Sequence, residues 1–487
     1  MSFLVYTNRA VQYACVAFAF WFIGVFAYVA ILSVNYPFHL EWMEGHTVDI
    51  ILRLREGLPF YTKPTLEYVP YIYTPYYFYV ATFVSFFTGV DFLAGRLVSL
   101  LSTFCLVWLL YAWMRKEGGD KLLSWVAAGL YLSTYVLSAR WFDVARVDSL
   151  YLLLMASGLY VFYFDRSKYV GLVSGCIFAA AFFTKQSALL ALIPCFLAAL
   201  YIRPRAALIA GSVTAVIILV GCLLLEYNSN AWFSFFVYHV PAGHVNDGRK
   251  ILTFWTEDLI PHCAMMVVVA VFGWLSTYKN GHKALLWYAS IALGFIGSAY
   301  LSRIHSYGHS NVIMPAHFAL ALLSGLLLMH SAGKYKIINI VACFALIYQF
   351  YSLIYDPQRF VPNQDAIARG NALLEEIRNI EGEVLVSELQ YVQPRVGKKT
   401  YTVGMAGFDL MRADLKGRNQ VKTEYVQSIA NAIKNKKFSA IVVGYFIRLG
   451  ELRGHYQLLK TIDNPQEFVT GGVYFNKARI FVPRLDK

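Results

Sequence analysis

Charged residues and recognisable catalytic signatures are both scarce in this sequence of 487 residues. Asp, Glu, Lys and Arg make up 15%, whereas 58% of the residues are hydrophobic, more than the core of a water-soluble protein can hold. No Walker phosphate loop, GxSxG elbow or dinucleotide fingerprint occurs, so nucleotide-driven transport and soluble-type hydrolysis lack their usual support. The seven cysteines have neither CxxC nor Cys/His ligand spacing, and we expect no disulfide and no zinc site.

Long apolar runs dominate the sequence instead. The first run, from about residue 11 to residue 33, is too long for a cleaved signal sequence and predicts a membrane anchor. Ten further runs lie at residues 92–114, 121–139, 148–164, 169–183, 186–202, 206–226, 260–278, 284–302, 312–331 and 335–355. The sequence therefore predicts a polytopic α-helical membrane protein with about eleven transmembrane helices.

The basic residues indicate which loops share a side of the membrane. The net charge of +13 is dispersed in short clusters between apolar runs, which is typical of topology signals rather than of a nucleic-acid surface. If the apolar stretch Tyr73–Gly89 is a juxtamembrane or re-entrant helix, the N-terminus and all basic loops become cytoplasmic. We then expect the outer side to contain residues 34–91, 140–147, 184–186, 227–259 and 303–311, and the C-terminal domain.

The composition changes after Tyr355. Charge rises, and the helical patterns of residues 365–380 and 424–436 alternate with short β-rich runs such as residues 383–387, 439–444 and 478–482. This pattern predicts a small soluble α/β domain over residues 356–487. Residues 1–355 then form the transmembrane domain, including the outer loop 34–91.

Two glutamates follow the first apolar run. Glu41 and Glu44 are spaced i, i+3, so they share one helix face. A partly desolvated carboxylate at a membrane interface is suited to remove a proton from an attacking hydroxyl or amine. A solvated acidic turn is the alternative interpretation.

The same outer loop contains arginines and many tyrosines. Arg53 offers a planar guanidinium to a lipid phosphate, while Tyr73 and Tyr76 belong to a dense cluster that offers ring faces and hydroxyls to a sugar. An ordinary aromatic belt at the membrane interface is the alternative.

Ionisable residues also lie at the mouths of later runs. Asp143, Arg146 and Asp148 fall where two apolar runs meet, and Lys185 lies between two others, against the positive-inside bias. Such residues are costly in a membrane unless they are paired or functional. A lipid-linked phosphate is a natural partner for Lys185, with a snorkelling lysine as the alternative, while Arg146 is either functional or in a structural ion pair with an aspartate.

The last outer loop of the transmembrane domain supplies Arg303, His305 and Asn311. Histidines recur here and near residue 240, but they lack HExxH order and a nearby carboxylate set, so we assign no metal ligands. Arg303, His305 and Asn311 are better interpreted as donor- or acceptor-binding groups. Ordinary hydrogen-bonded loop residues are the alternative.

Several motifs occur in an order that resembles a known group of enzymes. They are MEGHTVDIILRLREGLPFY, YIYTPYYFY, RLVSLLSTF, RWFDVARVDSLYLLL, FFTKQSALL and NVIMPAHFALALLSG. Over residues 1 to about 355 the chain is similar to GT-C-type membrane glycosyltransferases. The likeness is greatest to the branch of protein O-mannosyltransferases and the lipid A aminoarabinose transferase, in particular to its uncharacterised bacterial members.

This resemblance implies inverting transfer of a sugar from a polyprenyl-phosphate donor to a lipid, glycan or protein acceptor at the periplasmic face of a bacterial inner membrane. Glu44 matches the acidic position of relatives as the base, and Glu41 is a candidate partner. Arg146 and Lys185 match basic residues near the carrier phosphate. No cofactor is required, although a divalent ion at Glu41, Glu44 and Asp148 stays an alternative.

Two other functions remain open at this stage. A transporter or flippase of lipid-linked saccharides would need the same spans, basic residues and aromatic platforms, but it usually shows internal repeats and broken spans, which this sequence lacks. A non-catalytic receptor or assembly subunit would use the C-terminal domain to bind a partner. The sequence does not specify the sugar or the acceptor.

Overall fold

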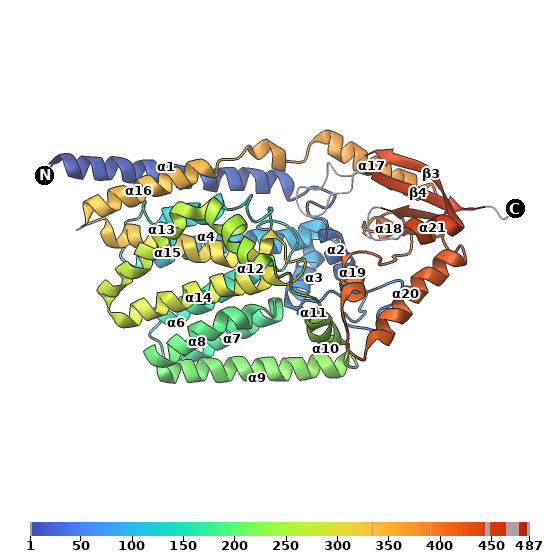
Figure 1. Cartoon of the computed structure of the whole chain (residues 1–487), viewed down its shortest axis with the longest axis horizontal. Helices are drawn as coiled ribbons and strands as arrows, with labels where there is room; N and C mark the ends of the chain where they lie inside the picture. The colour runs from blue at the N-terminus through green and yellow to red at the C-terminus, as the bar shows by residue number, and fades with distance from the viewer. Residues whose placement is uncertain (1, 334, 390, 444–448, 464–476, 485–487) are drawn as a thin grey trace.

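The computed structural model describes residues 2–333, 335–389, 391–443, 449–463 and 477–484. Figure 1 shows long helices lying side by side, with a smaller part that contains a β-sheet at one end of the bundle. The first helix runs along the bundle from the chain's N-terminus toward this smaller part. The outer loops of the sequence lie between the two parts.

The bundle helices occupy the eleven predicted apolar runs. They are α1 (Ser2–Ser33), α4 (Phe92–Lys116), α5 (Trp125–Ser133), α6 (Asp148–Phe164), α7 (Val170–Thr184), α8 (Ala188–Ile202), α9 (Pro204–Asn228), α13 (Ile260–Ser276), α14 (His282–Ile304), α15 (Met314–Ser331) and α16 (Lys336–Ser352). Within the described ranges, six spans are long and apolar enough to cross a membrane, and α6, α7 and α8 are shorter apolar helices. The prediction of a polytopic helical membrane protein is confirmed.

Burial differs sharply among these helices. In the span that contains α15, 94% of the most apolar stretch of residues is buried, whereas in α9 only 11% of the corresponding stretch is buried. A helix that is apolar all round and buried belongs to the centre of a bundle, and one that exposes apolar side chains on most of its surface faces lipid. Helix α15 is therefore central and α9 peripheral.

Short elements form the end of the bundle that faces the sheet. They are α2 (Glu44–Arg55), α3 (Tyr76–Thr88), α10 (Trp232–Ser234), η1 (Phe235–His239), α11 (Val240–Ala242), α12 (Lys250–Thr253), η2 (Phe254–Leu259) and η4 (Ser310–Ile313). Helix α3 does not cross the bundle. Tyr77, near its start, donates to the carbonyl of Gly95 in the first turn of α4, and Asp91, just beyond its end, pairs with Arg395 of the C-terminal part. Helix α3 therefore lies at the end of the bundle that faces the sheet, and its juxtamembrane or re-entrant position stays a prediction.

The opposite end of the bundle contains the basic turns. There Glu117 accepts hydrogen bonds from Tyr288 and from Asn280 of η3 (Thr277–Asn280), and Arg203 donates to the carbonyls of Phe162 and Asp165. These contacts bring the turns after α4, α6, α8 and α13 to one side. That arrangement agrees with the charge pattern, while the orientation of the chain in the membrane stays a prediction.

The C-terminal part combines a small sheet with short helices. After η5 (Pro357–Phe360), its elements are α17 (Gln364–Arg378), β1 (Val384–Val386), α18 (Val392–Arg395), α19 (Met405–Arg412), α20 (Asn419–Lys434), β2 (Ala440–Val443), α21 (Leu449–His455), β3 (Tyr456–Asp463) and β4 (Lys477–Pro483). The strand order is β1-β2-β4-β3, with β1 parallel to β2 and the other pairs antiparallel. The predicted α/β character is confirmed. The division at residue 355 stays a prediction, and α16 ends three residues before it.

Direct contacts join this part to the outer loops. The backbone N–H of Thr402 donates to the carbonyl of Leu66 over 2.9 Å, and Tyr391 and His39 share a hydrogen bond of 2.8 Å. The N–H of Asp414 donates to the carbonyl of Gly243 over 2.8 Å. The sheet-containing part is thus attached to the end of the bundle where the predicted site residues lie.

Candidate active site

Glu44, the predicted base, lies at the start of α2 in a fully buried ion pair with Arg96 of α4. Arg96 donates from Nε to Oε1 over 3.0 Å and from Nη2 to Oε2 over 2.8 Å. The backbone N–H groups of Leu40 and Ala145 each donate to a different oxygen of the same carboxylate over 2.6 Å. Burial raises the pKa of Glu44, but Arg96 and these donors outweigh it and hold the pKa below its ordinary value. Both oxygens of Glu44 are therefore occupied.

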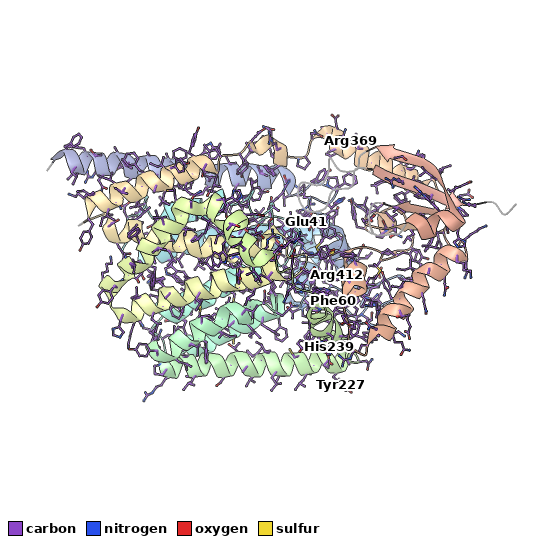
Figure 2. All side chains as sticks on the ribbon, viewed as in Figure 1. Glu41, Phe60, Tyr227, His239, Arg369 and Arg412 are labelled. Carbon is purple, nitrogen blue, oxygen red and sulfur yellow. The ribbon has the colours of Figure 1, made fainter. Side chains whose placement is uncertain are left out.

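Glu41 lies one turn earlier, and its carboxylate lacks the hydrogen bonds that Glu44 has. Its side chain is completely buried, and among the described residues neither carboxylate oxygen has a hydrogen-bond partner. The nearest cation is Arg146, whose Nε lies 3.9 Å from Oε2. Burial raises the pKa of Glu41 to about 8, with Arg146 lowering it and Glu44 raising it. In Figure 2, Glu41 lies where the bundle meets the C-terminal part.

Arg146 lies in the loop between α5 and α6 and is surrounded by aromatic rings. Its guanidinium carbon is 5.4, 5.2 and 5.3 Å from the ring centres of Tyr71, Tyr73 and Trp141. Its Nη2 donates to the hydroxyl of Tyr73 over 3.1 Å, whereas its Nε has no hydrogen-bond acceptor among the described residues. Ring faces stabilise a buried cation even when some of its N–H groups lack a hydrogen-bond acceptor. Arg146 can therefore still receive an anion.

A second ion pair lies at the start of α6. Lys185, just after α7, donates to Oδ1 of Asp148 over 2.7 Å, and Asn311 of η4 donates to the same oxygen over 2.9 Å. Oδ2 of Asp148 has no partner within the described ranges. The structure thus brings five predicted residues from separate segments into one cluster, which we call the central cluster. Its members are Glu41, Tyr73, Arg146, Asp148 and Lys185, with Asn311 at its edge.

Other predicted residues have partners of their own. Arg303 forms an ion pair with Asp258 at 2.7 Å, and Arg53 covers the ring of Tyr68 at 4.0 Å. Asp143 accepts from the Tyr135 hydroxyl over 3.0 Å. These contacts favour structural roles for all three predicted residues.

Two further predicted residues lie at the edge of this region. His305 shares a hydrogen bond of 3.2 Å with the carbonyl of Pro241, and Tyr76, at the start of α3, is 39% exposed. Among the described residues, no hydrogen bond or ion pair joins either side chain to the central cluster.

Solved structures share this arrangement of helices and C-terminal part. ArnT from Cupriavidus metallidurans, a lipid A aminoarabinose transferase, matches in its apo state with a TM-score of 0.62 and 12% identity, over 94% of this chain and 97% of ArnT. The chain has the GT-C fold. ArnT bound to undecaprenyl phosphate matches with a TM-score of 0.62 and 13% identity, again over 94% and 97% of the two chains.

A more distant match also has the GT-C fold. The Archaeoglobus fulgidus oligosaccharyltransferase, crystallised with Zn and sulfate, gives a TM-score of 0.50 and 12% identity over 93% of this chain and 73% of that protein. No protein-family model matches the sequence, and no curated protein matches it at a significant level. Because identities this low show only the shared fold, the activity has to be argued from the residues of this chain.

Within this GT-C fold, α19 of the C-terminal part contacts the bundle loops, and its Asp409 is close enough to the central cluster to feel the charge of Arg146. His244 shares a hydrogen bond of 2.8 Å with the carbonyl of Asp409, and Arg412 donates to the carbonyl of Ser306 over 2.9 Å. Asp409 is 2% exposed, and burial raises its pKa, with the adjacent Arg412 and the more distant Arg146 acting against that rise. Figure 2 labels Arg412 at the junction of the bundle and the C-terminal part.

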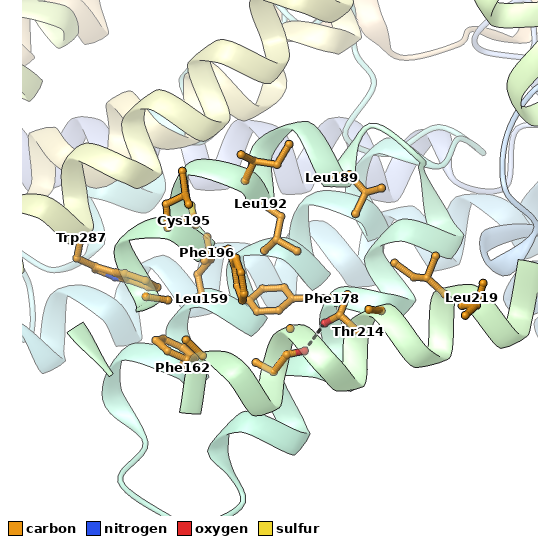
Figure 3. Close-up of a pocket in the computed structure, with 18 of the residues that line it drawn as sticks. Leu159, Phe162, Phe178, Leu189, Leu192, Cys195, Phe196, Thr214, Leu219 and Trp287 are labelled. Atoms are coloured by element: carbon orange, nitrogen blue, oxygen red, sulfur yellow. Dashed lines mark hydrogen bonds between the residues drawn. The ribbon is translucent and has the colours of Figure 1, made fainter. Parts of the chain in front are cut away.

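An apolar pocket opens in the membrane part of the fold. Its volume is about 650 Å³, and it lies among α6, α7, α8, α9 and α14 (Figure 3). Its lining includes Phe162, Phe178, Phe196 and Leu219, and the hydroxyl of Thr214 donates to the carbonyl of Ala210 over 2.7 Å. A pocket of this kind suits a hydrocarbon chain.

The carboxylates of the site do not fit a resident metal ion. In the described part of the chain, no three His, Cys, Asp or Glu side chains are grouped so that they could hold one. Glu44 is neutralised by Arg96, and Asp148 by Lys185. A divalent ion would have to displace both cations, so the alternative of a metal at Glu41, Glu44 and Asp148 finds no support in this geometry.

Sequence reasoning missed three residues of this region. Arg96 is the first letter of the RLVSLLSTF motif, and a charged residue in an apolar run is a signal that could have identified it. Trp141 sits in the RWFDVARVD motif but carries no charge. Asp409 is brought to the site only by the packing of the C-terminal part, and no local pattern marks it.

Proposed function

We propose that the protein transfers a sugar from a polyprenyl-phosphate-linked donor to an acceptor at the extracytoplasmic face of a bacterial inner membrane. The observation that carries this proposal is the buried carboxylate of Glu41, which has no hydrogen-bond partner among the described residues and lies 3.9 Å from Nε of Arg146. Direct displacement of a phosphate from the anomeric carbon of a sugar requires a base next to an anion-binding group. The GT-C fold supports the proposal, since ArnT with this fold was solved bound to undecaprenyl phosphate.

Glu41 is the better candidate for the base than Glu44. A base needs a free lone pair directed at the incoming hydroxyl, and the oxygens of Glu44 already accept from Arg96 and two backbone groups. The raised pKa of Glu41, about 8, makes its carboxylate a stronger proton acceptor than an ordinary glutamate. Glu44 instead fixes the loop that carries Glu41.

Arg146 and Lys185 are the candidates for stabilising the phosphate. Arg146 is buried and the side chain of Lys185 is 12% exposed, so water screens both charges weakly and electrostatic stabilisation of a developing anion is strong. Lys185 is already paired with Asp148, so the phosphate would share this lysine. The apolar pocket among α6 to α9 and α14 suits the isoprenoid tail of the carrier.

The reaction is a single displacement. Glu41 takes the proton of the acceptor hydroxyl while the acceptor oxygen forms a bond to the anomeric carbon. The bond between that carbon and the phosphate oxygen breaks with its electron pair on the phosphate, which leaves as an anion next to Arg146 and Lys185. One displacement inverts the anomeric configuration, and the stable leaving group needs no second carboxylic acid.

The test is transfer of radiolabelled sugar from a panel of polyprenyl-phosphate sugars to membrane extracts. We compare the wild type with Glu41→Gln and Glu44→Gln at matched expression, and record the melting temperature of each purified protein. Glu41→Gln should lose transfer by about 100-fold or more without a decrease in melting temperature, because it removes the base and no stabilising contact. Glu44→Gln should show both reduced transfer and a lower melting temperature.

Other outcomes separate the alternatives. Full transfer by Glu41→Gln would remove this residue from the role of base. If the wild type transfers no sugar from any donor, the transporter and the non-catalytic subunit become the better interpretations.

A further inference from the structure

Unpartnered polar atoms gather around Arg146. Within the described ranges, Arg146 Nε, Asp148 Oδ2, both oxygens of Glu41, Trp141 Nε1 and His309 Nδ1 are buried without a hydrogen-bond partner. Each unsatisfied group of this kind costs about 1–3 kcal/mol, so a protein rarely keeps several of them in one place. The set contains donors and acceptors together. A ligand with many hydroxyl groups would satisfy both.

Trp141 is the member of this set that carries no charge. Its side chain is 3% exposed, its ring lies 5.3 Å from the guanidinium carbon of Arg146, and its ring centre is 5.6 Å from that of His309. The two rings are tilted by 43°. Trp141 and His309 thus form an aromatic wall next to the residues proposed to hold the phosphate.

The backbone before Trp141 adopts a costly conformation. Ala139 and Arg140 have φ values of 50° and 71°, in the left-handed region that residues with a side chain rarely adopt. Arg140 is held there by a hydrogen bond of 2.6 Å from Nη1 to the carbonyl of Phe360. Two consecutive residues of this kind turn the chain sharply just before Trp141, and such strain tends to accumulate at functional sites.

We infer that Trp141 is a sugar-binding residue of the donor site: its indole N–H donates to a hydroxyl of the donor sugar, and its ring forms one wall of the sugar pocket. The inference rests on the proposed function, since it places the sugar beside the phosphate group held by Arg146. A phosphate oxygen could accept the same N–H. The experiment therefore has to compare ligands with and without the sugar.

The test measures binding of two probes to the purified full-length protein in detergent. The probes are undecaprenyl phosphate and a panel of undecaprenyl-phosphate hexoses, compared on wild type and Trp141→Phe. Phe keeps an aromatic ring and removes only the N–H and part of the area. We expect affinity for the sugar-bearing carrier to fall about three- to tenfold, and affinity for undecaprenyl phosphate to stay unchanged.

Trp287→Phe is the matched control. Trp287 of α14 is also buried with an unpartnered indole N–H, but it stacks on Phe162 and Tyr163 at 5.6 and 5.4 Å, along the apolar pocket. The control should change the affinity for both carriers to the same extent, because Trp287 lines the pocket proposed to hold the carrier's tail. A loss confined to the sugar-bearing carrier in the control would overturn the assignment to Trp141.

Each failure has its own signature. Equal weakening of both probes by Trp141→Phe assigns the indole to the phosphate and overturns the sugar contact, and unchanged binding of both overturns any contact. In either case the proposed function survives, because the wild type still binds the carriers. Wild-type protein that binds undecaprenyl phosphate and none of the sugar-bearing carriers overturns the inference and the proposed function together.

Discussion

The pH dependence of sugar transfer gives the sharpest test of Glu41. Burial raises the pKa of this carboxyl to about 8, and only the ionised form can accept a proton from the acceptor. About one-tenth of the molecules are ionised one pH unit below the pKa, and about one-hundredth two units below it. We therefore expect kcat/KM to rise about tenfold between pH 6 and pH 7, about fivefold between pH 7 and pH 8, and to level off near pH 9.

The assay is initial-rate transfer to an acceptor whose nucleophile is a hydroxyl, because such a group does not titrate in this range. The residual rate of Glu41→Gln should show no rise between pH 6 and pH 9. Arg146→Lys should keep a rise, since a cation still opposes the effect of burial. A wild-type profile that is flat over this range, or that rises only near pH 4 to 5, would refute the reasoning.

The same shift has a consequence for stability. A carboxyl whose pKa is raised in the folded protein binds its proton more tightly there than in the unfolded chain. Its stabilising contribution is complete below the unfolded pKa and is lost as pH rises through about 8, at about 1.4 kcal/mol per unit of pKa shift. The melting temperature of Glu41→Gln should therefore exceed that of the wild type at pH 8 and match it at pH 4, as measured in detergent.

Three further predictions follow from other contacts. Glu44→Gln should lower the free energy of unfolding by about 3–5 kcal/mol in thermal or denaturant unfolding, because the guanidinium of Arg96 is left buried without its counter-charge; an unchanged melting temperature would contradict this. Gly45→Ala should destabilise by about 1–3 kcal/mol, since its Cβ would lie 2.5 Å from the ring of the buried Tyr391, and wild-type stability would contradict the close contact. EDTA should leave transfer unchanged, and loss that is restored by a divalent ion would show a metal that these side chains do not suggest.

The membrane part of the fold could be predicted because hydropathy is a local property. Each apolar run contains a helix, and α3, which the charge pattern excluded from the spans, lies at the end of the bundle that faces the sheet. The run at residues 121–139 contains only nine α-helical residues in α5, because the chain has to turn through the left-handed residues Ala139 and Arg140. In the C-terminal part, β3 was not predicted, since its sequence mixes polar and apolar residues without strict alternation.

The candidate site could be predicted only in part. An ionisable residue beside an apolar run is costly unless it is paired or functional, and this identified Glu41, Arg146, Asp148 and Lys185. Sequence spacing could not show which of the two glutamates is free, since that depends on Arg96, which lies 52 positions after Glu44. The matching acidic position in relatives favoured Glu44, whereas the geometry supports Glu41 as the base.

The enclosure of the site determines what limits turnover. Glu41 and Arg146 are 0% and 2% exposed, so neither a donor on a lipid chain nor an acceptor can reach them in this arrangement. Every cycle of the proposed transfer must include a step that opens the cluster and a step that closes it, and α19 contacts the bundle loops through His244 with Asp409 and Arg412 with Ser306. Pre-steady-state measurements should therefore show a rapid first turnover followed by a slower steady rate, with chemistry faster than the release of carrier phosphate and glycosylated product.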